Sequence, residues 1–308
     1  MAARTPPSQP AGRQRSAGAK RAMGEWGRCH KARLLRMERW RPRRLARRRP
    51  AAVTRAETPA TLFSMRDRSA DDWNALGEAE PFFAVLTDER FLRERMSEVD
   101  REAFFASGEA DIAYLFVLIA QPDFAPKSAL DFGCGVGRLT RALTKRIERV
   151  AGVDVAPSML RIARENVPQA TFSAEIPDAC FDLIVSLIVF QHIPVRRGEA
   201  LLDELLSHLS DDGVAALQFT FRRPGSFLRR VARTIRGRVP LVHRIVLRMR
   251  GERPMPYMQM NEYDLERVTA ILHRRGCEEF RVIPTDHGGI KGAILVAKRK
   301  SGSVCPSN

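Results

Sequence analysis

A glycine-rich turn between two acidic residues is the feature of this sequence that most limits its fold. Residues 130–137 read Leu-Asp-Phe-Gly-Cys-Gly-Val-Gly, and Asp154, which also ends an apolar run, lies 23 positions beyond Asp131. Glycines at alternate positions let the backbone turn sharply after a strand and come close to a ligand, while carboxylates accept hydrogen bonds from that ligand. The pattern predicts two parallel strands whose carboxyl ends form a nucleotide-type binding site.

The net charge of +16 is concentrated at the N-terminus. The first 55 residues contain 17 Lys and Arg against two Glu, whereas the rest of the chain carries 35 basic and 34 acidic residues. Because the body is almost neutral, we do not expect nucleic acid as a partner of the fold. Residues 1–64 are rich in Arg, Pro and Ala and have little aliphatic periodicity, so we expect a disordered basic extension.

Three hypotheses account for this extension: a basic arm for nucleic acid or membrane, an organelle transit peptide, and an upstream segment that is not part of the working protein. We favour the third, because Met23, Met37 and Met65 offer later starts and organised sequence begins only near Met65. The extension also lacks the apolar stretch of a secretory signal.

Cysteines and apolar runs bear on the compartment. The five cysteines are scattered, without the spacing of a zinc site. The longest apolar runs, such as 183–190, fall far short of the roughly 20 residues that span a bilayer. We therefore expect a reduced, cytoplasmic protein with no metal site.

Apolar periodicity predicts an α/β protein. Residues 71–121 have helical spacing and form the expected helical N-terminal cap, 65–124. In the domain 125–300, strands and helices alternate, which indicates a Rossmann-like, seven-stranded, mostly parallel sheet with helices on both faces. The expected strands are 128–132, 149–153, 169–173, 181–186, 213–221, 279–283 and 293–298, and the expected helices are 138–147, 157–166, 198–208 and 261–275.

A basic insertion, 222–253, contains eleven arginines and a single acid. Its apolar residues recur at helical spacing on both sides of Pro240, which predicts two short amphipathic helices. The insertion is either a solvated lid over the active site or a surface for anionic lipid or an anionic substrate. Peripheral membrane contact through 222–253 is therefore one hypothesis for this chain.

The glycine spacing separates two kinds of cofactor site. A dinucleotide fingerprint requires a third glycine at position 138, where this chain has Arg138, and a carboxylate at Asp131 would repel a pyrophosphate. Residues 131–137 instead resemble the first motif of the class I S-adenosylmethionine-dependent methyltransferases of the small-molecule type, and the resemblance covers about residues 125–300. It implies a Rossmann-like fold and S-adenosyl-L-methionine as cofactor.

The resemblance also implies a set of cofactor contacts. Asp131 and the glycine loop would hold the methionine portion and its ammonium, Asp154 the two ribose hydroxyls, and Glu175 the adenine amine. A carboxylate suits a vicinal diol because it is a bidentate acceptor. The full expected set is Asp131, Gly133, Cys134, Gly135, Gly137, Asp154, Val155, Glu175 and Gln191.

Two histidines are candidates for a catalytic general base. His192 follows the fourth expected strand in a segment, 191–194, that by the resemblance faces the acceptor pocket, and His287 precedes two glycines in a turn where Asp286 could orient it. A hydroxyl acceptor gains from losing its proton as the new bond forms, and an imidazole titrates in the useful range. Each histidine could equally be structural, His192 as a loop contact and His287 as part of a hairpin turn.

The expected function is S-adenosylmethionine-dependent methylation of a small or medium acceptor at oxygen or nitrogen. An RNA or protein methyltransferase is the first alternative, which the basic tail and insertion could serve. Against this alternative, the chain has Gln-His-Ile-Pro at residues 191–194. By the resemblance, family members that modify adenine or glutamine usually carry an Asn-Pro-Pro-Tyr-type segment at this place. A non-catalytic protein that keeps the cofactor fold as a scaffold is the second alternative, and the intact pair of Asp131 and Asp154 around the glycines argues against it.

Overall fold

The chain divides into two units, residues 1–64 and 65–308. The computed structural model describes residues 69–119, 121, 123–225, 240–249 and 255–301 of the second unit. The expectations for residues 1–64, and for the first helix of the basic insertion, lie outside the described residues.

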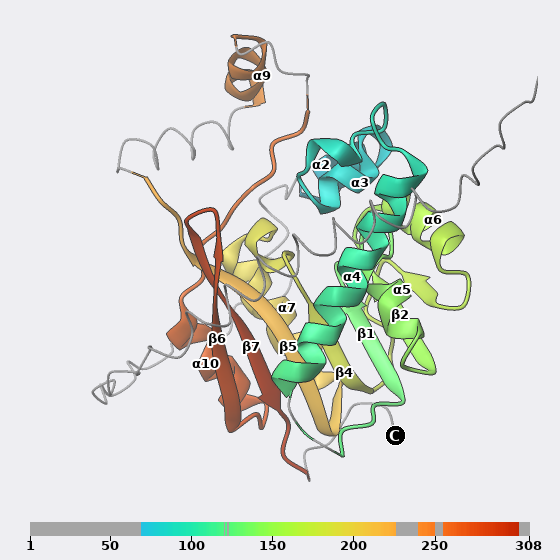
Figure 1. Ribbon diagram of the computed structural model, residues 1–308. Coiled ribbons are helices and arrows are strands. Elements are labelled where there is room, and N and C mark those ends of the chain that lie inside the picture. The colour runs from blue at the N-terminus through green and yellow to red at the C-terminus, as the bar shows by residue number, and fades with distance from the viewer. Residues whose placement is uncertain (1–68, 120, 122, 226–239, 250–254, 302–308) are drawn as a thin grey trace, which may run out of the picture. The chain divides into compact units, whose positions relative to one another are not determined.

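Seven strands of the described chain form one sheet in the order β3-β2-β1-β4-β5-β7-β6 (Figure 1). The pairings among β1 to β5 are parallel, and β7 runs antiparallel to both β5 and β6. The predicted α/β class and the seven-stranded, mostly parallel sheet are thereby confirmed. The strands are β1 (Ser128–Phe132), β2 (Arg149–Val153), β3 (Thr171–Ser173), β4 (Phe181–Ser186), β5 (Leu209–Arg222), β6 (Glu279–His287) and β7 (Ile290–Lys298).

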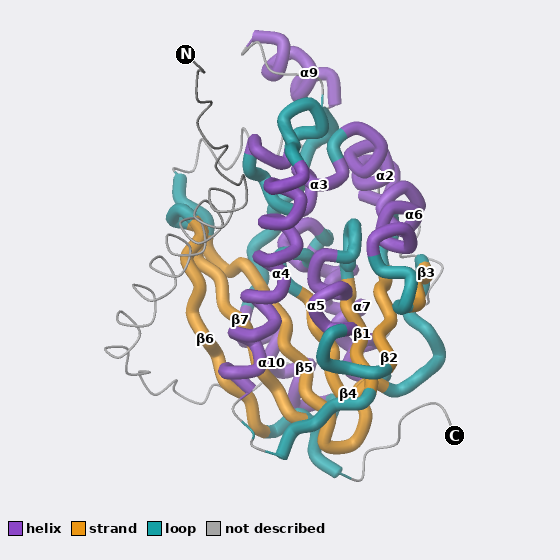
Figure 2. Tube along the Cα trace, turned by 45° about the vertical axis from the view of Figure 1, so that its right-hand side comes forward, coloured by secondary structure: helices purple, strands orange, loops and turns teal. Residues whose placement is uncertain are grey.

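Helices cover both faces of this sheet. On one face α4 packs against α5, and on the other α7 packs against α10, while α2 contacts α6 (Figures 1 and 2). The helices are α2 (Ser69–Ala79), α3 (Pro81–Val85), α4 (Glu98–Ile119), α5 (Arg138–Thr144), α6 (Pro157–Asn166), α7 (Val195–Ser207), α9 (Pro240–Met249) and α10 (Leu265–Arg274), with short 3-10 turns η2 (Glu89–Phe91) and η3 (Phe190–His192).

The last two strands pair over a longer stretch than their apolar pattern predicts. The predicted strands 279–283 and 293–298 become 279–287 and 290–298, because the ladder continues to the pair His287 and Ile290. Gly288 and Gly289 close the hairpin with φ of 62° and 90°, backbone angles that side-chain-bearing residues rarely adopt. The apolar pattern did not predict this extension, because residues near the turn are polar. Backbone pairing in a hairpin does not require apolar side chains.

Local capping explains where α10 begins and ends. The helix starts at Leu265 rather than at 261, because the Asp264 side chain accepts a hydrogen bond from the Glu266 amide at 2.9 Å. It ends before Gly276, whose φ of 78° confirms the predicted left-handed stop.

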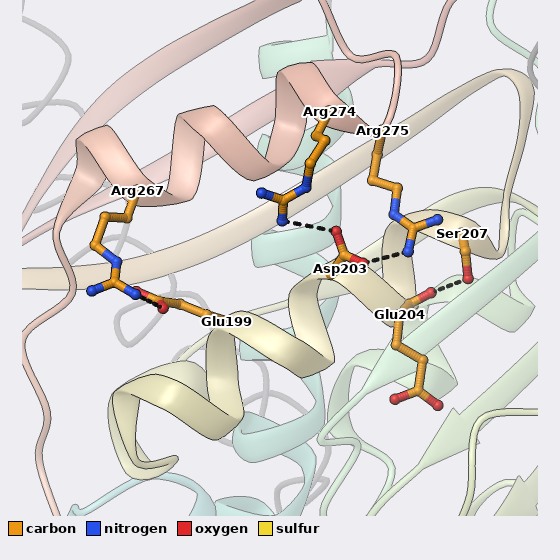
Figure 3. Close-up of polar contacts among 7 residues, drawn as sticks. All are labelled: Glu199, Asp203, Glu204, Ser207, Arg267, Arg274 and Arg275. Carbon is orange, nitrogen blue, oxygen red and sulfur yellow. Dashed lines mark hydrogen bonds and ion pairs between the residues drawn. The ribbon is translucent and has the colours of Figure 1, made fainter. Parts of the chain in front are cut away.

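Ion pairs join α7 to α10 (Figure 3). Arg267 lies 2.5 Å from Glu199, Arg274 lies 3.1 Å from Asp203, and Arg275 also bonds to Asp203. Figure 3 shows the Glu204 side chain pointing away from these pairs. The pairs and the apolar core beneath them fix the orientation of α7.

A cluster of aromatic rings forms the centre of the core between the sheet, α7 and α10. Phe190 is fully buried, with its ring centroid 4.5 Å from Phe219, 5.9 Å from Phe132 and 6.0 Å from Tyr263. These contacts anchor η3. They therefore fix the backbone of the residues that follow Phe190 in the loop after β4.

Helix α9 is the described helix of the basic insertion and begins at Pro240. His243 and Leu247 are buried, and the exposed residues are Arg244, Ile245, Arg248 and Met249. Basic and apolar side chains together on an exposed face are typical of helices that contact anionic membranes. Contact with anionic lipid stays a prediction. Within the described ranges, no helix is both long enough and apolar enough to cross a membrane.

The aromatic cluster generates a stability prediction. Phe190→Ala removes a fully buried ring and should lower the free energy of unfolding by about 3–5 kcal/mol, from lost burial and the cavity left behind. Urea unfolding followed by circular dichroism measures the loss. The control is Val117→Ala on α4, whose side chain is 69% exposed, and which should change stability by less than about 0.5 kcal/mol. Equal stability of the two variants would contradict this account of the core.

Candidate active site

A cavity of about 420 Å³ lies where the carboxyl ends of β1, β2 and β4 meet α2 and α3. Its volume is in the range of sites that bind small molecules and cofactors. The segments after the strands supply the glycine loop and Asp154, α2 supplies Trp73, and α7 supplies Arg197, Leu201 and Glu204.

The glycine loop after β1 lines the cavity with backbone. Gly133 and Gly135 have φ of 77° and 53°. A Cβ atom at Gly133 would lie 2.3 Å from Val189, and one at Gly135 would lie 2.8 Å from Val85. Both glycines are therefore required by conformation and by space.

Asp154 connects the glycine loop to the end of β2. Its Oδ2 accepts from the Gly135 amide at 2.9 Å, and its Oδ1 accepts from the Ala156 amide at 2.9 Å. Burial raises the pKa of Asp154, and the two amide hydrogen bonds lower it. The carboxylate lines the cavity, and each oxygen keeps a second lone pair for a ligand hydroxyl.

Asp131 occupies a different place from the one expected. The residue is 1% exposed, does not line the cavity, and accepts a hydrogen bond from Thr140 Oγ1 at 2.6 Å. Burial raises the pKa of Asp131 to about 6, against the opposing effects of the Thr140 hydrogen bond and the Arg138 charge. Its carboxylate ties β1 to α5, so the geometry does not support direct contact with a ligand ammonium.

Three other expected cofactor contacts also lie outside the cavity lining. Cys134 is a buried thiol under the loop, Gly137 precedes α5 with φ of 87°, and Gln191 accepts from Thr220 Oγ1 at 2.9 Å. Cys134 alternates with Gly133 and Gly135 along the turn and therefore faces away from the ligand side, whereas Gly137 lies at the N-cap of α5. The cavity lining does include the remaining predicted set, Gly133, Gly135, Asp154, Val155 and Glu175.

His192 lines the cavity, and its ring is held on several sides. Nδ1 donates to the Gln259 carbonyl at 2.6 Å, so Nε2 is the acceptor for the Gln191 amide at 3.1 Å. The ring also meets Trp73 edge-on at 4.9 Å between centroids. Burial lowers the pKa of His192 to about 4, with a smaller contribution from Arg223. At neutral pH this imidazole is uncharged and bonded through both nitrogens.

His287 lies outside the cavity lining, at the end of β6. Its Nε2 bonds to the Gln218 side-chain amide at 3.0 Å, and Gln218 Oε1 accepts from the Ile188 amide at 3.2 Å. Ile188 lines the cavity with φ of 65°. The second histidine does not line the cavity and is linked to Ile188 through Gln218, which does not support direct proton transfer to a ligand.

Trp73 and Arg138 are two of the cavity-wall residues to which sequence reasoning gave no ligand role. Trp73 comes from α2 and Arg138 from the first position of α5. Arg138 is 3% exposed and forms an ion pair with Asp111 at 2.7 Å. Its position directly after the glycine loop was the available signal, but the sequence does not distinguish a buried arginine there from a solvated one.

Comparison with known proteins identifies related domains. A family profile described as a methyltransferase domain matches residues 129–213, from β1 into β5. The trans-aconitate 2-methyltransferase of Azoarcus sp. (strain BH72) is 42% identical over 98 residues, which cover 30% of this chain and 38% of the relative. The enzyme of the same name from Afipia carboxidovorans is 30% identical over 151 residues, covering 46% and 58%. The matches thus span 38% and 58% of the length of these two curated relatives.

A solved structure shows the same architecture. The magnesium protoporphyrin IX methyltransferase from Synechocystis PCC 6803, with bound S-adenosylhomocysteine, superposes with a TM-score of 0.50 at 19% sequence identity. The superposition covers 75% of this chain and 97% of that chain. It confirms the Rossmann-like fold.

The buried Asp131 carboxyl predicts a pH effect on stability. Its folded pKa of about 6 lies above the ordinary value of 3.8, so the folded state holds this proton more tightly than the unfolded state does. The free energy of unfolding of the wild type should then fall, relative to Asp131→Asn, by on the order of 3 kcal/mol as pH rises from about 4 to about 6. Urea unfolding of both proteins between pH 4 and pH 7 measures this difference.

The difference between the two proteins is the informative quantity. The lowered pKa of His192 has the opposite effect, because it reduces the free energy of unfolding as pH falls through the same range. This effect is present in both proteins and therefore cancels in the difference. Parallel stability curves for the wild type and Asp131→Asn would contradict the raised pKa of Asp131.

Proposed function

We propose that this protein, whose residues 129–213 match a methyltransferase-domain profile, is a class I S-adenosylmethionine-dependent methyltransferase that transfers a methyl group from S-adenosyl-L-methionine to the oxygen or nitrogen of a small or medium acceptor. The observation that carries the proposal is the position of Asp154. Its carboxylate lines the cavity beside the glycine loop and is held there by two backbone amides.

The cavity residues fit this donor. A carboxylate that keeps free lone pairs suits the two ribose hydroxyls, and Glu175, which lines the same cavity, suits the adenine amine. Val155, Ile176 and Leu187 supply apolar surface for a flat purine ring. The glycines of the loop have no side chains, so the amino-acid portion of the donor can approach the backbone there.

When bound, S-adenosyl-L-methionine supplies an electrophilic methyl carbon. The contribution of this chain is to position the acceptor and exclude water, which together can lower the barrier substantially. Trp73, Ile193 and Leu201 supply apolar wall to the cavity for that purpose.

His192 acts in this proposal as a positioning residue. It connects the segment containing Gln259 to the loop after β4 and supports Trp73. Accepting a proton at Nε2 would require it to release Gln191, and its lowered pKa makes it a weak base. An acceptor that already presents a lone pair at neutral pH, such as a carboxylate, needs no such base.

Among such acceptors we favour a carboxylate. The relatives from Azoarcus and Afipia are named for trans-aconitate, an organic acid with three carboxyl groups. Methylation of RNA or protein is the alternative, and the exposed Arg244 and Arg248 of α9 are the described residues that favour it. A non-catalytic scaffold is the remaining alternative, and it predicts no binding of the donor.

Asp154 provides the first test. Asp154→Ala should lower the affinity for S-adenosylhomocysteine by on the order of tenfold or more, because charge-assisted hydrogen bonds are lost. Isothermal titration calorimetry measures the affinity. Asp182→Asn is the matched control, because that carboxylate is bonded to the Lys127 and Ser128 amides away from the cavity lining. Unchanged affinity in Asp154→Ala would rule out the proposed cofactor site.

The role of His192 is tested by comparing two variants. His192→Asn keeps a donor near the Gln259 carbonyl but has no basic nitrogen, whereas His192→Ala keeps neither. If the residue positions the loop, the asparagine variant should lose less than about tenfold in turnover and retain more than the alanine variant, since a general base contributes roughly 10²–10⁴-fold. The readout is transfer of labelled methyl groups into a fractionated native extract. Equally large losses in the two variants would assign His192 as the base.

A further inference from the structure

A second cavity, of about 370 Å³, is lined by residues of α3, of the segment 91–101 and of α6. It shares no lining residue with the cavity of the candidate active site. Helix α3 contributes Phe82 to this second cavity and Val85 to the other. Helix α6 contributes Ile162 to the second cavity and Met159 to the other. The second cavity, which we call the cap cleft, is therefore a separate place for a ligand.

Apolar side chains form part of the cap cleft. Pro81 and Phe91 are buried, and Phe82 and Ile162 are half-buried. The Phe82 ring meets the Phe104 ring edge-on at 5.0 Å between centroids, so the apolar core of the helical cap holds it in place. The volume of the cleft and this part of its lining suit a small molecule with an apolar body.

Two arginines of the cap cleft, Arg93 and Arg101, bond their guanidinium groups to neutral oxygens among the residues that the structure describes. Arg93 Nη2 donates to the Glu78 carbonyl at 2.8 Å, and Arg101 Nη2 donates to Asn166 Oδ1 at 2.6 Å. Neither positive charge is paired with a carboxylate there. Because a guanidinium has five N–H donors, each arginine keeps donors for a ligand.

Arg101 is held at its place in the cleft. Asn166, which accepts its hydrogen bond, also donates through Nδ2 to the Val136 carbonyl at 2.9 Å. The Arg101 guanidinium lies 5.9 Å from the centroid of the Phe82 ring. A side chain that is already held in position loses less conformational entropy when a ligand binds.

Acidic residues limit the charge of a ligand in the cap cleft. Glu98 and Glu165 also line the cleft, and Glu165 pairs with the third arginine of the lining, Arg161, at 3.4 Å. Glu80 lies outside the lining and accepts from the Arg93 backbone amide at 2.7 Å. The three arginines of the lining exceed its two glutamates by one charge. This balance favours a monoanion over a dianion such as a phosphate monoester.

We propose that the cap cleft binds a small organic acid, with its single carboxylate at Arg93 and Arg101 and its apolar body against Phe82 and Ile162. A planar guanidinium matches the two oxygens of a carboxylate, and hydrogen bonds between these charged groups are among the stronger ones in proteins. The inference goes beyond the proposed methyl transfer and does not depend on it, because the cap cleft and the candidate active site share no lining residue.

The experiment compares three probes by isothermal titration calorimetry on the full chain. The first probe, 2-naphthoate, has both a carboxylate and an apolar ring system. The second, 2-naphthamide, has the same rings without the charge, and acetate has the carboxylate without the rings. The titrations are made at about 0.15 M ionic strength, where the attraction between separated exposed charges is largely screened.

Two double variants locate the binding. Arg93→Gln combined with Arg101→Gln removes both unpaired charges from the cap cleft. Arg90→Gln combined with Arg95→Gln is the matched control, because these two arginines form ion pairs in the neighbouring segment and lie outside the cleft lining. Arg93 and Arg101 are exposed, so their substitution should preserve the fold. Arg93→Gln alone serves if the first double variant does not fold.

The wild type should bind 2-naphthoate on the order of tenfold or more tightly than 2-naphthamide or acetate. The advantage over 2-naphthamide should be lost in the variant at Arg93 and Arg101 and kept in the control variant. Equal wild-type affinities for the two naphthalene probes, or equal losses in the two double variants, would overturn the inference. Equal affinities for 2-naphthoate and acetate would also overturn it, because they would indicate an adventitious ion only.

Discussion

The site depends on the way in which the backbone after β1 is bound to the end of β2. The amides of Gly133 and Cys134 donate to the Val153 carbonyl at 2.7 and 3.0 Å, and the Gly135 amide donates to Asp154. Three consecutive donors thus meet two consecutive acceptors. Because the turn requires left-handed backbone and close approach to Val189 and Val85, glycine is required at Gly133 and Gly135. The position of Asp154 beside the cavity follows from this hydrogen-bonding pattern.

Charge around this turn is divided between two sides. Asp154 lines the cavity, whereas Asp131 is directed into the contact between β1 and α5, where Thr140 takes its hydrogen bond. Arg138 lines the cavity, and its Nη1 is bonded to Ser107 and Asp111 of α4. The buried acid and the buried arginine therefore link the helical cap, the sheet and the cavity. The two groups also interact electrostatically, since the charge of Arg138 lowers the pKa of Asp131.

The order of strands, the helices between them and the hairpin at the end were predictable, because apolar periodicity and capping residues are local signals. The stop at Gly276 is such a case. Element ends that depend on pairing were not predictable in this way. The strands β6 and β7 extend to His287 and Ile290 because each partner supplies the other's hydrogen bonds, and no side-chain pattern records that. In this extension His287 pairs with Ile290 in the ladder, and it does not line the cavity.

By itself, the sequence determined the fold class, the glycine loop and the carboxylate at the end of the second strand. These features follow from spacing along the chain and from the restricted backbone angles of glycine. Only the tertiary structure decided which side chains face the cavity: Asp154 but not Asp131, His192 but not His287, and also Trp73 and Arg138. The reason is physical, since the direction of a side chain and the burial of its charge depend on helices packed from distant parts of the chain. Asp111 and Ser107, which hold Arg138, precede it by 27 and 31 residues.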